Sequence, residues 1–216
     1  YGLKANVSVR INPDIDAHTH KYVTTGLYEN KFGISQHEFD KLIDIIKKSE
    51  HINFYGLHFH IGSQITRVSE VFALECCRVN DIVAYFERNG LKVDNINLGG
   101  GLGVDYDDPD ENPIADFETW FETINANIVR REDQSVHIEP GRSLVAQCAT
   151  LISRVLFVKS GETKNFLIMD AGMNDLIRPA LYGAYHKIEN LSAAQRTFFP
   201  THQAYDIVGP VCESSD

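Results

Sequence analysis

The sequence has no excess of basic residues. Of its 216 residues, 20 are Lys or Arg and 30 are Asp or Glu, so the formal net charge is −10 with neutral histidines. Nucleic acids and anionic membranes are bound through basic patches that displace counterions. The acidic balance, spread along the chain, therefore argues against a nucleic-acid partner and against an acidic lipid surface.

Long apolar runs and a disulfide framework are also missing. No apolar run approaches the roughly 20 residues of a membrane-spanning helix, and we expect no secretory leader. The unevenly spaced cysteines, two of them adjacent, fit a reducing compartment rather than a set of disulfides. They are Cys76, Cys77, Cys148 and Cys212. We expect a globular cytoplasmic protein with no membrane partner.

Four glycines within five positions follow a short apolar run. The run Val93–Leu98 predicts a buried strand, and the glycines come directly after it, at positions 99, 100, 101 and 103. Glycines let backbone N–H groups approach an anion, and a following helix adds the positive end of its dipole. A strand, a glycine loop and a helix in this order predict a phosphate site. A plain glycine turn between packed elements explains an isolated Gly-Gly-Gly equally well.

Strands and helices alternate up to Arg142. Amphipathic spacing predicts helices over 35–46, 72–86 and 117–128, and Ser35 with Glu38 forms a capping box for the first of them. Apolar and alternating runs predict strands over 7–11, 52–61, 93–98 and 136–138. This order indicates a parallel sheet with functional residues at the carboxyl ends of its strands.

The pattern changes after Arg142. A long β-rich run over 144–158 and shorter strands over 166–169 and 205–211 predict a mostly antiparallel region. We therefore expect two domains, residues 1–142 and residues 143–216.

Several polar residues stand where strands are expected to end. His60 and Ser63 suit contact with a flat ring and an anion, although a core histidine beside a turn serine is an equally good explanation. The pairs His58 with His60 and His18 with His20 fit half of a metal site, but no aspartate or cysteine cluster completes either. Glu139 requires a cationic or N–H partner if it is buried.

Taken together, these segments resemble one family, the alanine-racemase-like pyridoxal-phosphate decarboxylases, and within it the diaminopimelate decarboxylases. The motifs in order are Arg10-Ile11-Asn12-Pro13, Lys31-Phe32-Gly33-Ile34, His58-Phe59-His60-Ile61-Gly62-Ser63-Gln64, Gly99-Gly100-Gly101-Leu102-Gly103, Glu139-Pro140-Gly141-Arg142-Ser143, Met173-Asn174-Asp175-Leu176-Ile177-Arg178-Pro179 and Cys212-Glu213-Ser214.

The resemblance implies a (β/α)8 barrel over residues 1–142, followed by a β domain over 143–216. It also implies the last step of lysine biosynthesis, decarboxylation of meso-2,6-diaminopimelate to L-lysine and CO2. The cofactor would be pyridoxal 5'-phosphate, with no metal, and the enzyme would be a homodimer with shared active sites. The same motifs leave related decarboxylases of ornithine, arginine or carboxynorspermidine open.

The resemblance also implies a role for each matching residue. Lys4 would form the Schiff base with the cofactor, and Cys212 would donate a proton. The cofactor-binding residues would be His60, Ser63, Gly99, Gly100, Gly101, Glu139, Pro140, Gly141 and Arg142. The substrate-binding residues would be Arg142, Arg178, Tyr182 and Glu213.

Two departures from the family pattern stand out. Lys4 runs almost directly into the strand that ends in Arg10, and we count about five barrel strands where a closed barrel has eight. The chain also ends just after Cys212-Glu213. These departures predict an internal deletion after Lys4 and a C-terminal truncation. They leave a non-catalytic remnant open, and a metal-dependent barrel hydrolase using His58 and His60 is a remote alternative.

Overall fold

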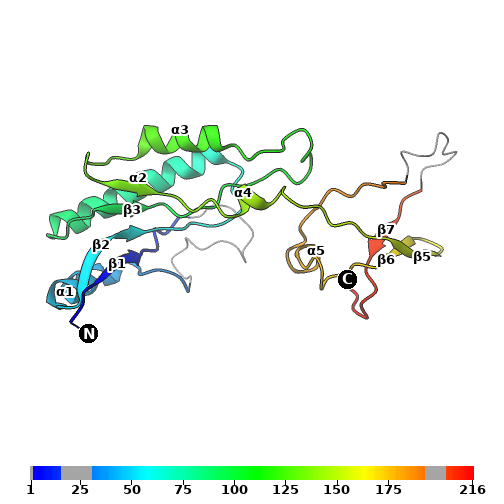
Figure 1. Ribbon diagram of the computed structural model, residues 1–216, viewed down its shortest axis with the longest axis horizontal. Helices are drawn as coiled ribbons and strands as arrows, with labels where there is room; N and C mark the ends of the chain where they lie inside the picture. Colours follow the sequence, from blue (N-terminus) through cyan, green and yellow to red (C-terminus); the bar gives the residue numbers. More distant parts are fainter. Residues whose placement is uncertain (1, 16–30, 193–202) are drawn as a thin grey trace. The chain divides into compact units, whose positions relative to one another are not determined.

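The computed structural model describes residues 2–15, 31–192 and 203–216, which form two compact units (Figure 1). Unit 1 comprises Tyr1–Val104 and Asn112–Cys148, and unit 2 comprises Asp105–Glu111 and Ala149–Asp216. The division into domains at residues 142 and 143 stays a prediction.

Unit 1 is built on a sheet of four parallel strands. These are β1 (Ala5–Arg10), β2 (Ile52–His58), β3 (Asn95–Asn97) and β4 (Ser135–His137), in the spatial order β1-β2-β3-β4. Each pair of neighbours is parallel, so the predicted parallel sheet is confirmed. The strand predicted over 7–11 is β1, which starts two residues earlier at Ala5, whereas residues 2–4 belong to no strand.

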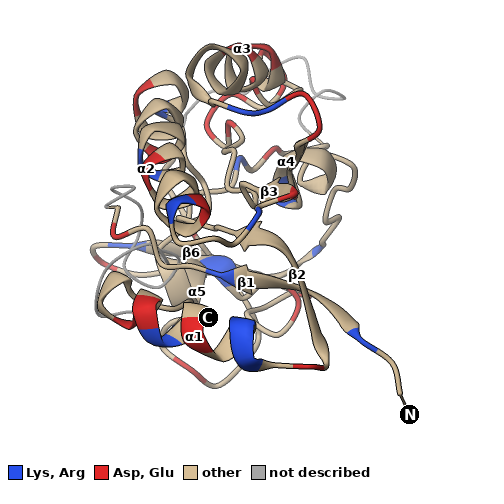
Figure 2. Ribbon diagram, turned by 90° about the vertical axis from the view of Figure 1, so that its left-hand side faces the viewer, with Lys and Arg blue, Asp and Glu red and all other residues tan. Residues whose placement is uncertain are grey.

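Three helices connect these strands: α1 (Phe39–Lys48), α2 (Val68–Arg88) and α3 (Phe117–Asn127). Figure 2 shows acidic and basic residues of both signs along α1 and α2. The predicted capping box of Ser35 is wrong, because the Ser35 side chain caps nothing. Its carbonyl instead accepts the Glu38 N–H in a short 3-10 turn, η1 (Gln36–Glu38), ahead of α1.

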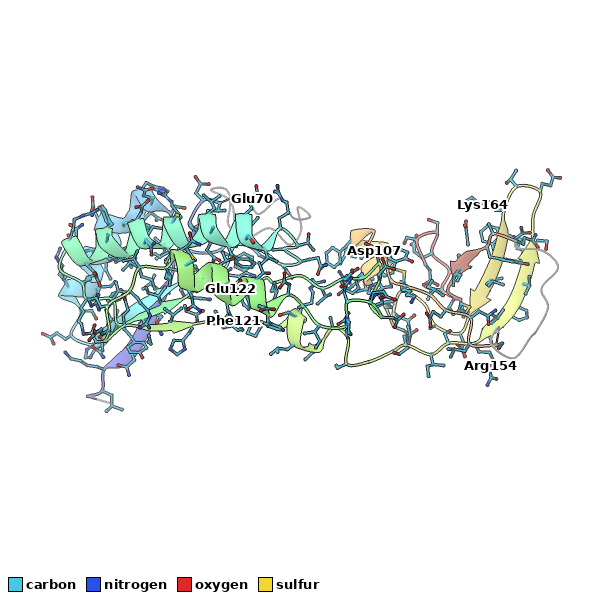
Figure 3. All side chains as sticks on the ribbon, turned by 90° about the horizontal axis from the view of Figure 1, so that it is seen from above. Glu70, Asp107, Phe121, Glu122, Arg154 and Lys164 are labelled. Carbon is cyan, nitrogen blue, oxygen red and sulfur yellow. The ribbon has the colours of Figure 1, made fainter. Side chains whose placement is uncertain are left out.

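Apolar side chains spaced at three and four residues bury one face of α2 against the sheet and against α3. Phe72 on α2 lies 5.3 Å from the ring of Trp120 on α3, and Phe86 lies 5.1 Å from Phe39 on α1. All four rings are almost fully buried. Burying an aromatic side chain stabilises the folded state by about 1.5–3 kcal/mol, so these contacts hold the helices over the strands. Figure 3 shows Phe121 and Glu122 on α3, and Phe121 is partly exposed.

The residues after the glycine turn differ from the prediction. The next helix, α3, begins only at Phe117, and residues 105–111 belong to unit 2. No helix amino terminus directly follows the glycines, so a helix dipole does not contribute to this turn. Asp116 caps α3 instead, where its side chain accepts the Thr119 N–H at 3.0 Å.

Unit 2 contains a small mixed sheet of β5 (Val155–Ser160), β6 (Asn165–Met169) and β7 (Asp206–Val208). β5 and β6 are antiparallel, but β6 and β7 are parallel, so the region is not purely antiparallel. Lys164, in the turn between β5 and β6 (Figure 3), pairs with Asp206 at 2.8 Å.

The long β-rich run predicted over 144–158 is wrong at its start. It begins inside a short helix, α4 (Arg142–Val145), and the strand starts only at Val155. A second short helix, α5 (Arg178–Tyr182), was not predicted. Within the described residues, no helix is both long and apolar enough to cross a bilayer.

Candidate functional site

Four polar residues lie in one row at the carboxyl edge of the unit 1 sheet. Arg10 is the register partner of His58, His58 of Asn97, and Asn97 of His137, and each is the last residue of its strand. Register partners on neighbouring strands point to the same face. The parallel order therefore collects side chains that lie far apart in the sequence.

Glu139, just beyond β4, extends this row. Its Oε1 accepts a hydrogen bond from Asn97 Nδ2 at 2.8 Å, and its Oε2 lies 3.6 Å from His58 Nε2. The carboxylate remains 55% exposed. One oxygen is thus held by the protein while the group stays accessible to a ligand.

Arg10 brings a positive charge to the row. Its guanidinium lies 4.7 Å from the centre of the Phe32 ring, a cation–π contact. Burial lowers the pKa of Arg10, and the charge of Glu139 partly opposes this effect. The Nη2 of Arg10 and the Nε2 of His58 are buried and have no hydrogen-bond partner among the described residues. Of these two atoms, His58 Nε2 faces the Glu139 carboxylate at 3.6 Å, so Arg10 Nη2 is the donor whose hydrogen bond is not accounted for.

The surroundings of the two histidines favour the neutral form of each ring. Burial is the main cause that lowers the pKa of both His58 and His60. The charge of Glu139 opposes this shift, and the positive charge of Arg10 adds to it. His60 Nδ1 accepts the Gly100 N–H at 3.3 Å, which places the proton of the neutral ring on Nε2.

The glycines after β3 are required by the neighbouring backbone. A Cβ at Gly99 would lie 2.2 Å from the Phe59 carbonyl oxygen, and one at Gly100 would lie 1.9 Å from the Glu139 carbonyl oxygen. Gly99 also has φ +70°, a conformation that favours glycine. Close strand packing is thus sufficient to explain these two glycines. Their role in phosphate binding stays a prediction.

A second loop runs beside the glycine turn and carries Ser63, which is half-buried. Ile65 N–H donates to Gly101 O and Gly103 N–H donates to Ile65 O, both at 2.9 Å. The Gln64 side chain adds two hydrogen bonds to the Val104 backbone, at 2.6 and 3.2 Å. These four bonds fix the two loops together.

The Glu-Pro-Gly-Arg segment turns sharply after β4. Gly141 has φ +43°, and the Ser143 hydroxyl donates to Pro140 O at 2.7 Å. Arg142 opens α4 and is half-buried. The structure thus brings Glu139 and Arg142 into the same unit as His60, Ser63 and the glycine turn.

The remaining predicted residues lie in unit 2. Arg178, at the start of α5, places its guanidinium 4.7 Å from the Tyr106 ring centre and its Nη1 3.1 Å from His186 Nε2. Tyr182 ends the same helix, and Cys212 and Glu213 are exposed. A guanidinium can only donate hydrogen bonds, so His186 accepts at Nε2.

Lys4 is not brought to the row of polar residues. It is exposed and directly precedes β1, whereas Arg10 ends β1. Six strand residues at a rise of about 3.3 Å each separate the two ends by roughly 20 Å, more than a lysine side chain can span. The Schiff-base role expected for Lys4 therefore finds no support in its position.

The sequence analysis assigned no role to Arg10, which it quoted only within the Arg10-Ile11-Asn12-Pro13 motif, and it assigned none to Asn97 or Tyr106. A signal existed for Arg10, a charged residue at the end of an alternating strand, and for Asn97, a polar residue directly between an apolar run and the glycines. No comparable signal exists for Tyr106.

The structure gives no support for a metal site at His58 and His60. In the parts of the chain that the structure describes, no three His, Cys, Asp or Glu side chains are grouped to hold a metal ion. His18 and His20 lie outside the described residues.

Comparison with known proteins connects this site to a family. The family described as "Pyridoxal-dependent decarboxylase, pyridoxal binding domain" matches residues 2–146. The diaminopimelate decarboxylase of Bacteroides thetaiotaomicron is 51% identical over 212 residues, which cover 98% of this chain and 53% of that protein.

Two solved structures are also similar. Diaminopimelate decarboxylase from Helicobacter pylori, complexed with L-lysine, is 40% identical with a TM-score of 0.84, over 100% of this chain and 51% of that one. The enzyme from m. jannaschi is 34% identical with a TM-score of 0.80, over 100% of this chain and 49% of that one. The chain spans about half the length of these relatives. Its match to the family over residues 2–146 shows that this chain belongs to the pyridoxal-dependent decarboxylases.

Proposed function

We propose that this chain supplies the pyridoxal-phosphate site and part of the substrate site of a decarboxylase that converts meso-2,6-diaminopimelate to L-lysine and CO2. The observation that carries the proposal is the Glu139 carboxylate, held by Asn97 beside His58 at the carboxyl edge of a parallel sheet. In the longer protein, we propose that the four parallel strands are part of a (β/α)8 barrel.

The side chains at this edge fit a pyridoxal phosphate. A protonated ring nitrogen requires an anionic acceptor, which Glu139 offers with its exposed carboxylate. A flat ring requires a flat neighbour, which the neutral imidazole of His60 offers. Arg10 Nη2, which has no hydrogen-bond partner among the described residues, offers a further donor to a polar ligand.

The phosphate would be held by the two joined loops and the turn after β4. Ser63 offers a hydroxyl, Gly101 and Gly141 offer backbone N–H groups, and Arg142 offers a positive charge. The Gly99 and Gly100 N–H groups already donate to Asn97 and His60, so they shape the turn rather than bind the anion.

Bound pyridoxal phosphate supplies an electron sink for the pair of electrons left when CO2 departs from the substrate. Glu139 would keep the proton on the ring nitrogen, which strengthens that sink. Cys212 is proposed to return a proton to the substrate carbon.

The diaminopimelate specificity would come from the distal end of the substrate. That end carries a carboxylate and an ammonium group, and a guanidinium binds a carboxylate with two parallel hydrogen bonds. Arg142, Arg178 and Tyr182 are the proposed carboxylate ligands, and Glu213 is the proposed ammonium ligand. Sites shared between two copies would make the enzyme a homodimer.

The position of Lys4 favours a second candidate, a chain that binds the cofactor without a covalent bond. In that case, the lysine that forms the Schiff base with the cofactor corresponds to a part of the relatives' sequences that this chain does not cover. This alternative predicts reversible binding of pyridoxal phosphate by the chain alone.

An absorption titration with pyridoxal phosphate, followed by borohydride reduction and mass analysis of the peptide with Lys4, tests both candidates. Uptake with a reduced adduct on Lys4 supports a complete cofactor site in this chain. Uptake that is lost on dialysis after reduction supports the binding-only candidate. Absence of uptake by the parent chain overturns the proposal, and Glu139→Ala serves as a control that should weaken uptake.

A further inference from the structure

The Asn97 side chain connects the carboxylate to the glycine turn. Its Nδ2 donates to Glu139 Oε1 at 2.8 Å, and its Oδ1 accepts the Gly99 N–H at 2.8 Å. The Asn97 carboxamide therefore acts as a hydrogen-bond donor toward Glu139 and as an acceptor toward Gly99. Only an amide side chain offers a donor and an acceptor in this arrangement.

The backbone reinforces this connection. Glu139 N–H donates to Gly99 O at 2.5 Å, and Leu98 N–H donates to His137 O at 2.9 Å. The main chain at Glu139 is thus fixed to the residue that Asn97 also caps. With its backbone held and one carboxylate oxygen bound, the side chain of Glu139 is confined to one orientation.

We propose that Asn97 is a positioning residue for Glu139. By holding Oε1, it leaves Oε2, which lies 3.6 Å from His58 Nε2, to accept from the ring nitrogen of the cofactor. It also couples this orientation to the glycine turn. The inference rests on the proposed function, since it concerns the same cofactor.

Charge explains why asparagine is suited to this position and aspartate is not. An aspartate could still accept the Gly99 N–H, but it has no donor for Glu139 and would place a second negative charge beside it. Asn97→Asp therefore removes one of the two bonds and keeps the other. Asn97→Ala removes both.

A pair of ligands separates positioning of Glu139 from a merely structural role. One is pyridoxal phosphate, and the other is its carbocyclic analogue, in which a CH group replaces the ring nitrogen. The parent chain is expected to bind pyridoxal phosphate more tightly. Because a hydrogen bond to a charged group contributes about 1.5–3 kcal/mol, Asn97→Asp should weaken pyridoxal phosphate about ten- to hundredfold and the analogue less than threefold.

Three further variants complete the experiment. Asn97→Ala should weaken both ligands, because the glycine turn loses its cap. Asn53→Asp is the matched control. Asn53 also donates to a side-chain oxygen, that of Asn6 at 2.6 Å, but it is the second residue of β2 and lies near the amino end of that strand. It should change neither affinity. The double variant Asn97→Asp with Glu139→Gln reverses donor and acceptor, so it should keep the fold and lose the preference for pyridoxal phosphate.

The outcomes are distinguishable. If Asn97→Asp weakens both ligands equally, or neither, the positioning role is overturned while the proposed function stands. If Asn97→Asp does not fold, Asn97→Ala decides, because it keeps Glu139; a preference for pyridoxal phosphate as large as that of the parent then overturns the inference. If the parent chain binds neither ligand, the proposed function fails and the inference fails with it.

Discussion

His60 accepts the backbone N–H of Gly100 at its Nδ1, at 3.3 Å, and this contact joins the end of β2 to the glycine turn after β3. A protonated imidazole has no lone pair at Nδ1 and cannot accept this bond. The geometry of the turn is therefore linked to the charge of the histidine.

The stability of the unliganded chain should fall as the pH is lowered below about 6.5. The folded-state pKa values of His58 and His60 are lowered, chiefly by burial, so the unfolded chain binds protons more readily. The contribution of the two histidines to the free energy of unfolding is fully present above their pKa in the unfolded chain. It is lost as the pH falls toward their pKa in the folded chain. Thermal denaturation between pH 5 and pH 8 measures how steeply the stability changes with pH. His60→Gln should flatten it, whereas the exposed His51→Gln should not; equal slopes in all three chains would contradict the prediction.

Gly100→Ala should be strongly destabilising. The added Cβ would lie 1.9 Å from the Glu139 carbonyl oxygen, so the backbone segments that follow β3 and β4 must separate. We expect a loss of more than about 3 kcal/mol in the free energy of unfolding, at the upper end of single substitutions. Gly141→Ala is the matched control, because its Cβ would meet nothing closer than 3.9 Å and only its φ of +43° is strained. That strain corresponds to about 1–2 kcal/mol. Urea denaturation of both variants measures whether Gly100→Ala lowers the free energy of unfolding more than Gly141→Ala does. Equal losses in the two variants would refute the prediction.

Glu75→Gln should stabilise the chain at alkaline pH. Glu75 is almost completely buried in α2, its Oε1 has no hydrogen-bond partner among the described residues, and burial raises its pKa well above the usual value. A raised folded pKa gives stability that is present below the unfolded pKa and is lost as the pH rises. The glutamine variant should exceed the parent by about 1–3 kcal/mol at pH 8 and match it near pH 4. A difference that does not change with pH would count against a neutral Glu75.

Tyr106→Leu should weaken binding at the proposed substrate carboxylate. The Tyr106 ring lies 4.7 Å from the Arg178 guanidinium, and a cation–π contact contributes about 0.5–1 kcal/mol or more. We expect a two- to fivefold loss of diaminopimelate affinity by calorimetry on the cofactor-loaded protein, in keeping with that energy. Tyr106→Phe keeps the ring and should stay within twofold of the parent. A loss in the phenylalanine variant as large as in the leucine variant would show that the ring is not the cause.

The glycine stretch illustrates how far sequence reasoning reached. The apolar run and the glycines correctly predicted a strand followed by a turn. The structural reason for Gly99 and Gly100 is a different one. The Phe59 and Glu139 carbonyls that exclude a Cβ there lie just beyond the ends of the neighbouring strands β2 and β4. Those contacts are non-local, and no pattern within the stretch reveals them.

For Lys4, sequence reasoning predicted a role that the structure does not support. A short motif suggested its role, yet a motif does not say at which end of a strand a side chain lies. Once Ala5–Arg10 forms one strand, Lys4 and Arg10 stand at opposite edges of the sheet.

The sequence by itself determined the alternation of strands and helices up to Arg142, the apolar stripes of α1, α2 and α3, and the family, because periodicity and motif order are local properties of the chain. Only the tertiary structure decided which polar residues meet. Arg10, His58, Asn97 and Glu139 come from four separate parts of the sequence, and the register of four parallel strands brings them to one edge. Register depends on how whole strands and helices pack, so it is not encoded in any one of the segments that it joins.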